Sequence, residues 1–511
     1  MTGAAHLLLT LQRRGLLSPG PPLRVAAQLA ALRTWGFGLG GEVMQAAARD
    51  PGRVALVDDG PAPLTYAALR DRAAGLARAL RAEHGIGPGD AVGVLCRNHR
   101  GFVLSTVALA LLGADAVLVN TAFSAAQVAS VARGHDLRLV IHDAEFPAPP
   151  GPALDAGRLE EVAAAAPPGP VRPPERSGRT IVLTSGTTGT PKGARRQNPA
   201  GLGPLATIID RIPVHAHDRM LIAAPLFHTW GYAALQVAVA LRAMVVLSRR
   251  FSPSSTVDLL RRHRCAALFA VPVMLERLLE ADLVLPGVRV VAVSGSALPG
   301  DLATRFMDVN GEVLYNLYGS TEVSWATIAT PADLRRSRST AGRPAHGTRV
   351  VILSPSGEPV PPGTVGRIFV GNEMLFDGYT TGSSVESRDG LLATGDLGRL
   401  DRDGMVRVEG REDDMVIVGG ENVHPAAVED VLAALPEVRE VAVVGVPDRD
   451  RGQALAAYIA LQPGADLPAE EVREHVRVRL ARFAVPRDVV FVTALPRTAT
   501  GKVIKHALLP P

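Results

Sequence analysis

The sequence is poor in cysteine, in aromatic residues and in long apolar runs. Its two cysteines, Cys96 and Cys265, lie far apart and each adjoins an apolar run, so we predict buried free thiols with neither a disulfide framework nor a metal-binding spacing. Free thiols suit a reducing cytoplasm. The longest apolar windows, 103–114 and 232–241, are shorter than the ~20 residues that a membrane-spanning helix needs.

The chain also lacks a strong charge imbalance. Its 511 residues carry 54 basic and 50 acidic side chains, without a dense basic run interleaved with aromatic residues. We therefore expect no nucleic-acid partner. With 47% hydrophobic residues, the length suits roughly three or four domain-sized units with large cores.

Lysine is nearly absent, because only three of the 54 basic residues are lysines: Lys192, Lys502 and Lys505. Where arginine is used almost everywhere, a lysine beside a glycine suggests a need for a compact and flexible ammonium group. Lys192 and Lys502 both follow this pattern.

What the sequence does contain is a stretch rich in glycine and hydroxyl side chains at 184–193, directly after the apolar run 181–183. Its backbone N–H groups and hydroxyls are suited to enclosing a polyphosphate. The P-loop pattern of NTPases does not fit, because Pro191 stands where that pattern needs glycine and Gly193 where it needs serine or threonine. A mobile surface turn is the alternative for this stretch taken alone.

Strand-like and helical patterns alternate around this stretch, which predicts an α/β fold with a parallel sheet. Apolar runs at 54–57, 91–95 and 116–119 alternate with helical patterns at 67–81 and 103–112. Residues 147–174, rich in proline, alanine and glycine, favour a surface connection. Alternating runs near 353–370 favour a small antiparallel β unit, and the residues after 425 favour a compact α+β unit.

The stretch at 184–193 resembles the phosphate loop of the adenylate-forming superfamily, which includes acyl-CoA synthetases, luciferases and the adenylation domains of peptide synthetases. Further segments resemble this family in the same order along the chain: 317–322, 394–396, 410–414, 419–420 and 496–502. The resemblance is to its acyl-CoA synthetases, in particular to fatty-acid–CoA ligases of the actinobacterial type. It implies an α/β fold with a large N-terminal domain, residues 1–410, of two α/β subdomains plus a small β unit, and a small mobile α+β C-terminal domain, residues 411–511.

The resemblance also implies roles for single residues. Lys502, Thr184 and Glu322 would be catalytic, Glu322 and Thr184 would hold Mg²⁺, and Asp413 would be the hinge between the domains. The implied ATP-binding residues are Thr184, Ser185, Gly186, Thr187, Thr188, Gly189, Lys192, Ser296, Asn316, Tyr318, Gly319, Ser320, Thr321, Asp396, Arg411 and Lys502. The implied acyl pocket consists of His228, Trp230, Gly295, Gly319 and Trp325, and the implied coenzyme A contacts are Gly419, Gly420 and Glu421.

Residue chemistry agrees with several of these roles and leaves simpler alternatives open. A carboxylate such as Glu322 suits Mg²⁺, and an ionised Asp396 can accept two hydrogen bonds from ribose hydroxyls. Adjacent glycines at 419–420 leave room for the narrow arm of pantetheine, although a β-bulge is the alternative. For His228 the alternative is a core histidine with its hydrogen bonds satisfied.

The implied function is the ATP-dependent activation of a carboxylic acid through an acyl adenylate to an acyl-CoA thioester, with release of AMP and pyrophosphate. An aromatic content of only 4%, an apolar region around Phe227, Trp230 and Trp325, and the resemblance of the N-terminal extension to actinobacterial fatty-acid ligases favour a medium- or long-chain fatty acid. Since no carrier-protein domain follows Lys505, coenzyme A is the favoured acceptor. The alternatives are an aryl or short-chain acid, an acyl-AMP ligase that loads a carrier protein, and a non-catalytic acyl-binding homologue.

Residues 1–45 precede the family-like part of the chain. Val25, Leu29 and Leu32 are spaced as one face of an amphipathic helix, which we expect to dock on the protein itself, with peripheral contact to a membrane as the alternative. The leucines at 7–9 come before Arg13 and Arg14, so a secretory signal is not expected. We expect a cytoplasmic protein, with membrane association left open, that is a monomer or a homodimer.

Overall fold

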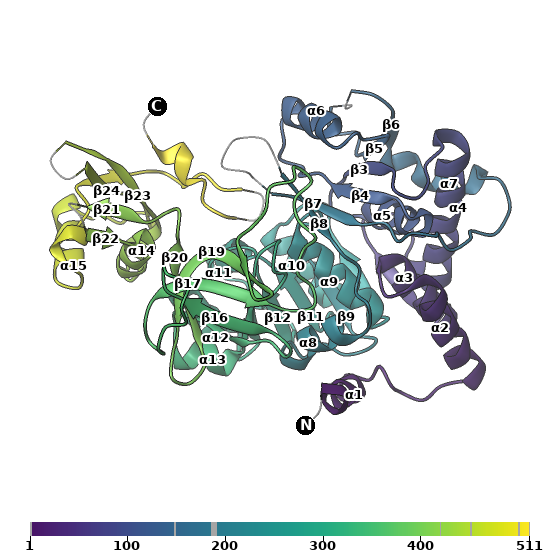
Figure 1. Ribbon diagram of the computed structural model, residues 1–511, viewed down its shortest axis with the longest axis horizontal. Helices are drawn as coiled ribbons and strands as arrows, with labels where there is room; N and C mark the ends of the chain where they lie inside the picture. The colour runs from purple at the N-terminus through teal and green to yellow at the C-terminus, as the bar shows by residue number, and fades with distance from the viewer. Residues whose placement is uncertain are drawn as a thin grey trace.

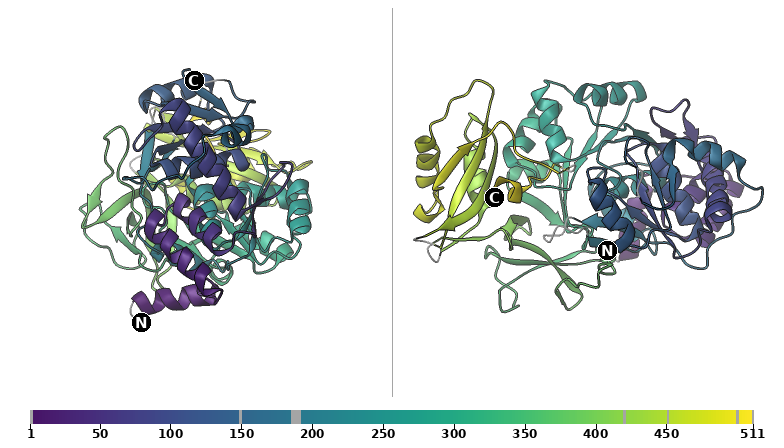
Figure 2. Two further views of the ribbon diagram at one scale, coloured as in Figure 1. Left: turned by 90° about the vertical axis from the view of Figure 1, so that its right-hand side faces the viewer. Right: turned by 90° about the horizontal axis from the view of Figure 1, so that it is seen from above.

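The computed structural model describes residues 3–147, 150–184, 192–418, 421–449, 452–498 and 501–509. Three β-sheets organise this part of the chain (Figure 1). Two of them belong to a large N-terminal domain, and the third belongs to a small C-terminal domain that lies at one end of the molecule (Figure 2, right, lime and yellow). The predicted α/β class and the division into a large and a small domain are confirmed.

The first sheet has the strand order β6-β5-β3-β4-β7-β8. Its strands are β3 (Ala91–Leu95), β4 (Asp115–Leu118), β5 (Leu139–His142), β6 (Ala153–Asp155), β7 (Thr180–Thr184) and β8 (Lys192–Arg196). All pairs are parallel except β7 with β8. Helices α4 (Tyr66–His84), α5 (Arg100–Leu112) and α6 (Ala125–Gly134) accompany it, and α5 is buried along nearly its whole length, as its continuous apolar sequence requires.

The second sheet has the order β16-β17-β19-β20-β15-β14-β13-β12-β11-β9-β10-β1-β2, with β18 beside β19. Its parallel part consists of β1 (Val54–Val57), β9 (Arg219–Ile222), β10 (Met244–Leu247), β11 (Ala267–Ala270), β12 (Val290–Val293) and β13 (Leu314–Tyr318). Its antiparallel strands are β2 (Leu64–Thr65), β14 (Thr327–Ala329), β15 (Thr340–Pro344), β16 (Arg349–Leu353), β17 (Gly366–Gly371), β18 (Ser387–Arg388), β19 (Leu391–Leu400) and β20 (Val406–Arg411). The predicted antiparallel unit is therefore an extension of this sheet.

Helices between and around the two sheets join them through one apolar core. The helices of this part are α3 (Leu39–Arg49), α8 (Gly203–Arg211), α9 (Thr229–Ala240), α10 (Pro253–His263), α11 (Pro272–Glu280), α12 (Gly300–Asn310) and α13 (Pro331–Arg336). Helix α9 packs against α3 and against the parallel strands β9, β10 and β11. This position makes α9 the element that links the first residues of the chain to the ends of the central strands.

The small domain has its own sheet and its own core. Its elements are β21 (Val416–Val418), β22 (Glu421–Val423), α14 (Pro425–Ala433), β23 (Val438–Asp448), β24 (Gly452–Leu461), α15 (Ala469–Arg477), η2 (Arg482–Ala484), β25 (Asp488–Phe491) and η3 (Lys505–Leu508). This is the predicted α+β unit. The boundary at residues 410 and 411 stays a prediction.

The structure corrects one local expectation and agrees with another. Residues 147–174 contain β6, η1 (Ala156–Arg158) and α7 (Leu159–Ala165), and α7 packs against α4, where a Cβ on Gly75 would strike the backbone of Ala163. The N-terminal region forms α1 (Gly3–Arg13) and α2 (Pro22–Trp35). Helix α2 packs against α3 with Val25 and Leu32 partly buried, in agreement with the expected docking on the protein itself, whereas Leu29 is 62% exposed. Among the described residues, no helix is both long and apolar enough to cross a bilayer.

Candidate active site

A cavity of about 230 Å³ lies along α9 in the large domain. Thr229, Ala233, Gln236, Val237 and Ala240 line it, and their spacing of three and four residues places them on one face of the helix. Because Thr229 and Ala240 are eleven residues apart, this face is about 16 Å long at a rise of 1.5 Å per residue. The cavity is thus elongated, with one end at the start of α9 and the other at its end.

The opposite wall is formed where the parallel strands of the second sheet end. Ala224, Val271, Ser294 and Gly319 all line the cavity, and they follow the carboxyl ends of β9, β11, β12 and β13. Open parallel sheets bind their ligands at the carboxyl ends of the strands. The topology of the sheet therefore explains the location of the cavity, whatever the identity of the single residues that line it.

All five residues predicted for the acyl pocket line this cavity: His228, Trp230, Gly295, Gly319 and Trp325. The indole N–H of Trp230 donates to the carbonyl oxygen of Ala270 at 3.0 Å, and that of Trp325 donates to the hydroxyl of Thr348 at 3.1 Å. Because both polar edges are satisfied elsewhere, the two tryptophans can offer apolar ring surface to a ligand.

His228 directly precedes α9 and is partly buried, with its Nε2 atom shielded from solvent. Its Nε2 atom has no hydrogen-bond partner among the described residues. Burial lowers the pKa of the His228 imidazole to about 4, so the ring is neutral at pH 7. The simpler alternative was a core histidine whose ring nitrogens are both hydrogen-bonded. His228 does not match it, because its Nε2 is unpaired among the described residues and the residue lines a cavity.

The start of α9 lies against the 317–322 segment. The Thr229 hydroxyl is 3.2 Å from the Thr321 hydroxyl, and both Ser320 and Thr321 line the cavity. A Cβ on Gly319 would strike the carbonyl oxygen of Ser324, so the turn that places these hydroxyls requires glycine at 319. Asn316, on β13, is buried, and its Oδ1 atom lacks a partner in the described part of the chain.

Tyr379 connects two of the predicted phosphate-site residues. Its hydroxyl donates to Glu322 Oε1 at 2.5 Å, and its ring lies 5.8 Å from the Lys192 ammonium. A carboxylate beside a loop suited to phosphates fits Mg²⁺, which takes one or two protein carboxylates and otherwise water and phosphate oxygens. Sequence reasoning missed Tyr379, because a tyrosine in a loop carries no motif of its own.

The predicted ribose and hinge residues form one hydrogen-bonded group. Asp396 on β19 lies opposite Arg411 on β20, and Tyr318 donates to Asp396 Oδ2 at 2.6 Å. Burial raises the pKa of Asp396, against the lowering effect of Tyr318 and Arg411. The Arg411 guanidinium reaches Asp396 Oδ1 at 3.4 Å and Asp413 Oδ1 at 3.0 Å, so it joins the candidate ribose ligand to the candidate hinge.

The C-terminal segment that carries Lys502 reaches the large domain at α11, and Figure 1 draws this end of the chain in yellow. Gly501 lies so close to Val273 of α11 that a Cβ at 501 would overlap Val273 Cγ1. Burial raises the pKa of Asp396, whereas Arg411 outweighs burial and lowers that of Asp413, and the Lys502 ammonium adds a smaller lowering effect at both carboxyls. The tail lysine therefore lies within electrostatic range of the ribose candidate.

Several predicted site residues are not placed by the structure. The side chain of Thr184 and residues Ser185, Gly186, Thr187, Thr188, Gly189, Gly419 and Gly420 lie outside the described residues. Ser296 lies in the loop between β12 and α12, and Glu421 is exposed at the start of β22. The roles assigned to these residues stay predictions.

Arg196 is a cavity residue that sequence reasoning missed. It is the last residue of β8, directly after the phosphate-loop stretch, and its Nη2 donates to Ser324 Oγ at 2.7 Å. Its Nη1 is buried without a hydrogen-bond partner, and no carboxylate forms an ion pair with it in the described ranges. Burial lowers the pKa of Arg196 to about 10, against the raising effect of Glu322, so it remains charged at pH 7.

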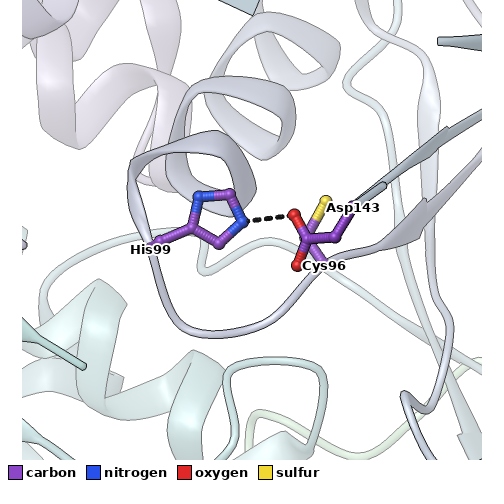
Figure 3. A group of neighbouring side chains, drawn as sticks. All are labelled: Cys96, His99 and Asp143. Carbon is purple, nitrogen blue, oxygen red and sulfur yellow. Dashed lines mark hydrogen bonds and ion pairs between the residues drawn. The ribbon is translucent and has the colours of Figure 1, made fainter. Parts of the chain in front are cut away.

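Cys96, His99 and Asp143 form a buried group that superficially resembles a metal site (Figure 3). His99 Nδ1 accepts from the backbone N–H of Gly101, so the proton is on Nε2, which lies 2.6 Å from Asp143 Oδ1. Burial raises the pKa of the Cys96 thiol well above its usual range. His99 and Asp143 therefore form hydrogen bonds at the start of α5, and the Cys96 thiol beside them is neutral. Both cysteines are buried and free, as predicted.

Comparison with known proteins agrees with this geometry. Residues 43–380 match the model of a family described as AMP-binding enzyme, and residues 427–502 match that of the AMP-binding enzyme C-terminal domain. Since the first match alone spans more than half of the sequence, the chain belongs to the AMP-binding enzyme family. The predicted adenylate-forming superfamily is thereby confirmed.

Individual relatives share both sequence and fold with the chain. A feruloyl-CoA synthase from Amycolatopsis sp is 33% identical, with 92% of this chain and 98% of that protein covered. A long-chain-fatty-acid–CoA ligase from Mycobacterium tuberculosis is 30% identical, with 87% and 92% covered. The structure of o-succinylbenzoate CoA synthetase from Bacillus subtilis with its acyl-adenylate intermediate is 29% identical, with a TM-score of 0.83 over 92% of this chain and 98% of that one.

The class of enzyme follows from these matches. The chain is an acid–thiol ligase of the AMP-forming acyl-CoA synthetase type, as the sequence predicted. Its reaction proceeds through an acyl adenylate and uses ATP, Mg²⁺ and coenzyme A.

Proposed function

We propose that the enzyme activates a carboxylic acid with a mainly apolar body of moderate size, either a medium-length chain or a single ring system on a short arm. The cavity along α9 carries this proposal. Its volume of about 230 Å³ is below the roughly 300–1,000 Å³ typical of ligand pockets, which disfavours the long-chain end of the fatty acids considered from sequence.

In the first half-reaction two anions must come together, because a carboxylate attacks the α-phosphate of ATP. We assign the acid's carboxylate to the Thr229 end of the cavity, where Thr229 lies beside Thr321, and take as its cation the Arg196 guanidinium, which is hydrogen-bonded to Ser324. Lys502 approaches the α-phosphate from the small domain, and Lys192 faces the β- and γ-phosphates. Fixed cations at a site where negative charge accumulates lower the barrier without reorganisation during the reaction. Mg²⁺, held by Glu322, supplies further charge neutralisation when bound.

In the second half-reaction a thiol attacks the adenylate carbonyl, and one lysine cannot serve both geometries. We propose that the small domain, which begins at residue 411, rotates about Asp413, and that this rotation withdraws Lys502 and brings the 419–421 segment to the thiol path. The hydrogen bond between Arg411 and Asp413 would have to change in that rotation.

The function is tested by measuring AMP release from a panel of acids, with and without coenzyme A. The panel should contain straight-chain acids from C4 to C16 and arylalkanoic acids. AMP release that depends on coenzyme A and peaks at medium chain length or with single-ring acids supports the proposal. Release only with a phosphopantetheinylated carrier protein favours an acyl-AMP ligase, and acid binding without ATP–pyrophosphate exchange favours a non-catalytic homologue.

We also propose that the N-terminal helices contact anionic lipid surfaces. Leu23 and Leu29 of α2 are 86% and 62% exposed, and Arg24 and Arg33 lie on the same helix. Exposed leucines flanked by arginines suit the interface of an anionic membrane. Vesicle flotation with and without phosphatidylglycerol tests this, with Leu23→Ser/Leu29→Ser as the variant. Equal flotation of variant and wild type would contradict it.

A further inference from the structure

The far end of the cavity is polar, although its walls are mainly apolar. Glu42 of α3 and Gln236 of α9 both line the cavity. Gln45, one helical turn after Glu42, donates to Glu42 Oε2 at 3.0 Å and reaches the carbonyl oxygen of Ala240 at 3.5 Å. Gln236 lies one turn before Ala240 on the same helix face. Gln236 therefore lies about 10 Å along the helix from Thr229, and Glu42, connected to Ala240 through Gln45, lies near the end of α9, about 16 Å from Thr229.

Within the described part of the chain, Glu42 forms no ion pair. It is only 5% exposed, and Arg242, the nearest cation acting on it, forms its ion pair with Asp50 instead, at 2.9 Å. Burial raises the pKa of Glu42 to about 8, against the lowering effects of Gln45 and Arg242, so the carboxyl group is mostly protonated at pH 7. A protonated carboxyl group offers one O–H donor as well as acceptors.

Part of the hydrogen-bonding capacity at this end is unused. In the described structure Glu42 Oε1 and the Gln236 amide have no hydrogen-bond partner. Leaving such groups unpaired beside an apolar ligand would cost binding free energy, whereas a ligand oxygen placed there would satisfy them. A neutral oxygen suits a protonated acid and an amide better than a second carboxylate does.

We propose that Glu42 and Gln236 recognise a hydroxyl or carbonyl oxygen at the end of the substrate opposite its carboxylate. The inference rests on the proposed function, because that function puts the reacting carboxylate at the Thr229 end and so directs the tail of the acid toward Glu42. The preferred substrates are then acids with an apolar body and a neutral oxygen at the far end, such as hydroxyaryl or ω-hydroxy acids. Simple fatty and unsubstituted aryl acids are poorer substrates.

Matched acids that differ by one oxygen test this inference. The probes are 4-hydroxycinnamate against cinnamate and 8-hydroxyoctanoate against octanoate. The ratio of kcat/KM within each pair is measured by ATP–pyrophosphate exchange, and the ratio of Kd by calorimetry without ATP. In the better-fitting pair we expect a preference of about tenfold for the hydroxylated acid, as one net hydrogen bond provides.

Three variants assign that preference to residues. Glu42→Leu and, separately, Gln236→Leu should reduce the ratio to about twofold or less, while Glu42→Gln, which keeps a donor and an acceptor, should retain most of it. Gln28→Leu is the matched control, because it removes the 2.7 Å hydrogen bond to Gln45 outside the cavity and should leave the ratio unchanged. Gln236→Leu keeps the test valid if Glu42→Leu fails to fold.

The results separate this inference from the proposed function. If neither pair shows a preference in the wild type, or if the preference survives both leucine variants, the inference is overturned and bound water is the partner of Glu42. If no acid supports AMP release, the proposed function fails. The Kd ratio of the hydroxylated and unhydroxylated acids then still shows whether the Glu42 end of the cavity binds an oxygen.

Discussion

Replacement of Arg196 by methionine should change activity and stability in opposite directions. Arg196 is partly buried, its Nη1 atom is buried and unpaired among the described residues, and its one described hydrogen bond goes to Ser324. If its partner is the carboxylate of the incoming acid, the variant loses a hydrogen bond between charged groups, about 1.5–3 kcal/mol. At about 1.4 kcal/mol per factor of ten, kcat/KM for the acid should fall roughly 10- to 150-fold.

The same substitution should not destabilise the protein. Removing a buried charge that lacks an ionic partner, and filling its place with an apolar side chain of similar length, is often neutral or stabilising by about 1–4 kcal/mol. We therefore expect an unchanged or higher Tm for Arg196→Met. If Arg196 had only a structural role, the Arg196→Met variant would instead have a lower Tm and normal turnover.

Steady-state ATP–pyrophosphate exchange at saturating ATP, together with a thermal melt, measures both effects. Arg195→Met is the matched control, since Arg195 is the neighbouring arginine on β8 and does not line the cavity. The assignment is refuted if Arg195→Met loses as much activity, or if Arg196→Met raises the KM for ATP and leaves that for the acid unchanged. The second result would place the guanidinium on a phosphate.

Three further predictions concern the tail and the far end of the cavity. Lys502→Ala should lower adenylate formation by roughly 10²-fold or more while thioester formation from preformed adenylate survives, and equal loss of both steps would contradict its role. Gly501→Ala, at a φ of +82° and against Val273, should also slow adenylation selectively, and Val273→Ala in the same chain should restore part of the rate. Glu42 has a folded-state pKa of about 8, above its usual 4.5, so it stabilises the fold below pH 4.5 and loses this contribution as pH rises through 8. Wild type should therefore lose about 2 kcal/mol of stability between pH 6 and 8 that Glu42→Gln keeps, and parallel Tm profiles would contradict the shift.

The fold was predictable because its evidence is local in the sequence. Apolar runs such as 91–95 and helical patterns such as 67–81 specify elements without reference to distant residues, and their alternation specifies a parallel sheet. The exceptions are segments whose structure depends on a partner. The alanine-rich residues 159–165 form α7 because Gly75 of α4 leaves room for them, and proline and glycine nearby made this segment look like a loop.

The site was predictable only where a residue belongs to a motif. His228, Trp230, Gly295, Gly319 and Trp325 lie far apart in sequence, and the resemblance rather than any periodicity grouped them in one cavity. Tyr379, Arg196 and Glu42 belong to no motif, and each acquires its chemistry from burial. Read alone, Arg196 is one of 51 arginines, and Glu42 is a charged residue near the start of a helix.

In the proposed orientation of the substrate, Arg196 and Glu42, which both line one cavity, act at its two ends and give it a direction. The charged Arg196 attracts the carboxylate of the substrate to the end beside Thr321. The protonated Glu42 side chain is neutral and can accept a neutral oxygen at the end beside Ala240. A ligand bound the other way round would place a carboxylate against Glu42 and leave the guanidinium without an anion. Because both penalties arise from desolvation, they grow as the ligand excludes water, and the correct orientation is favoured most strongly when the cavity is filled.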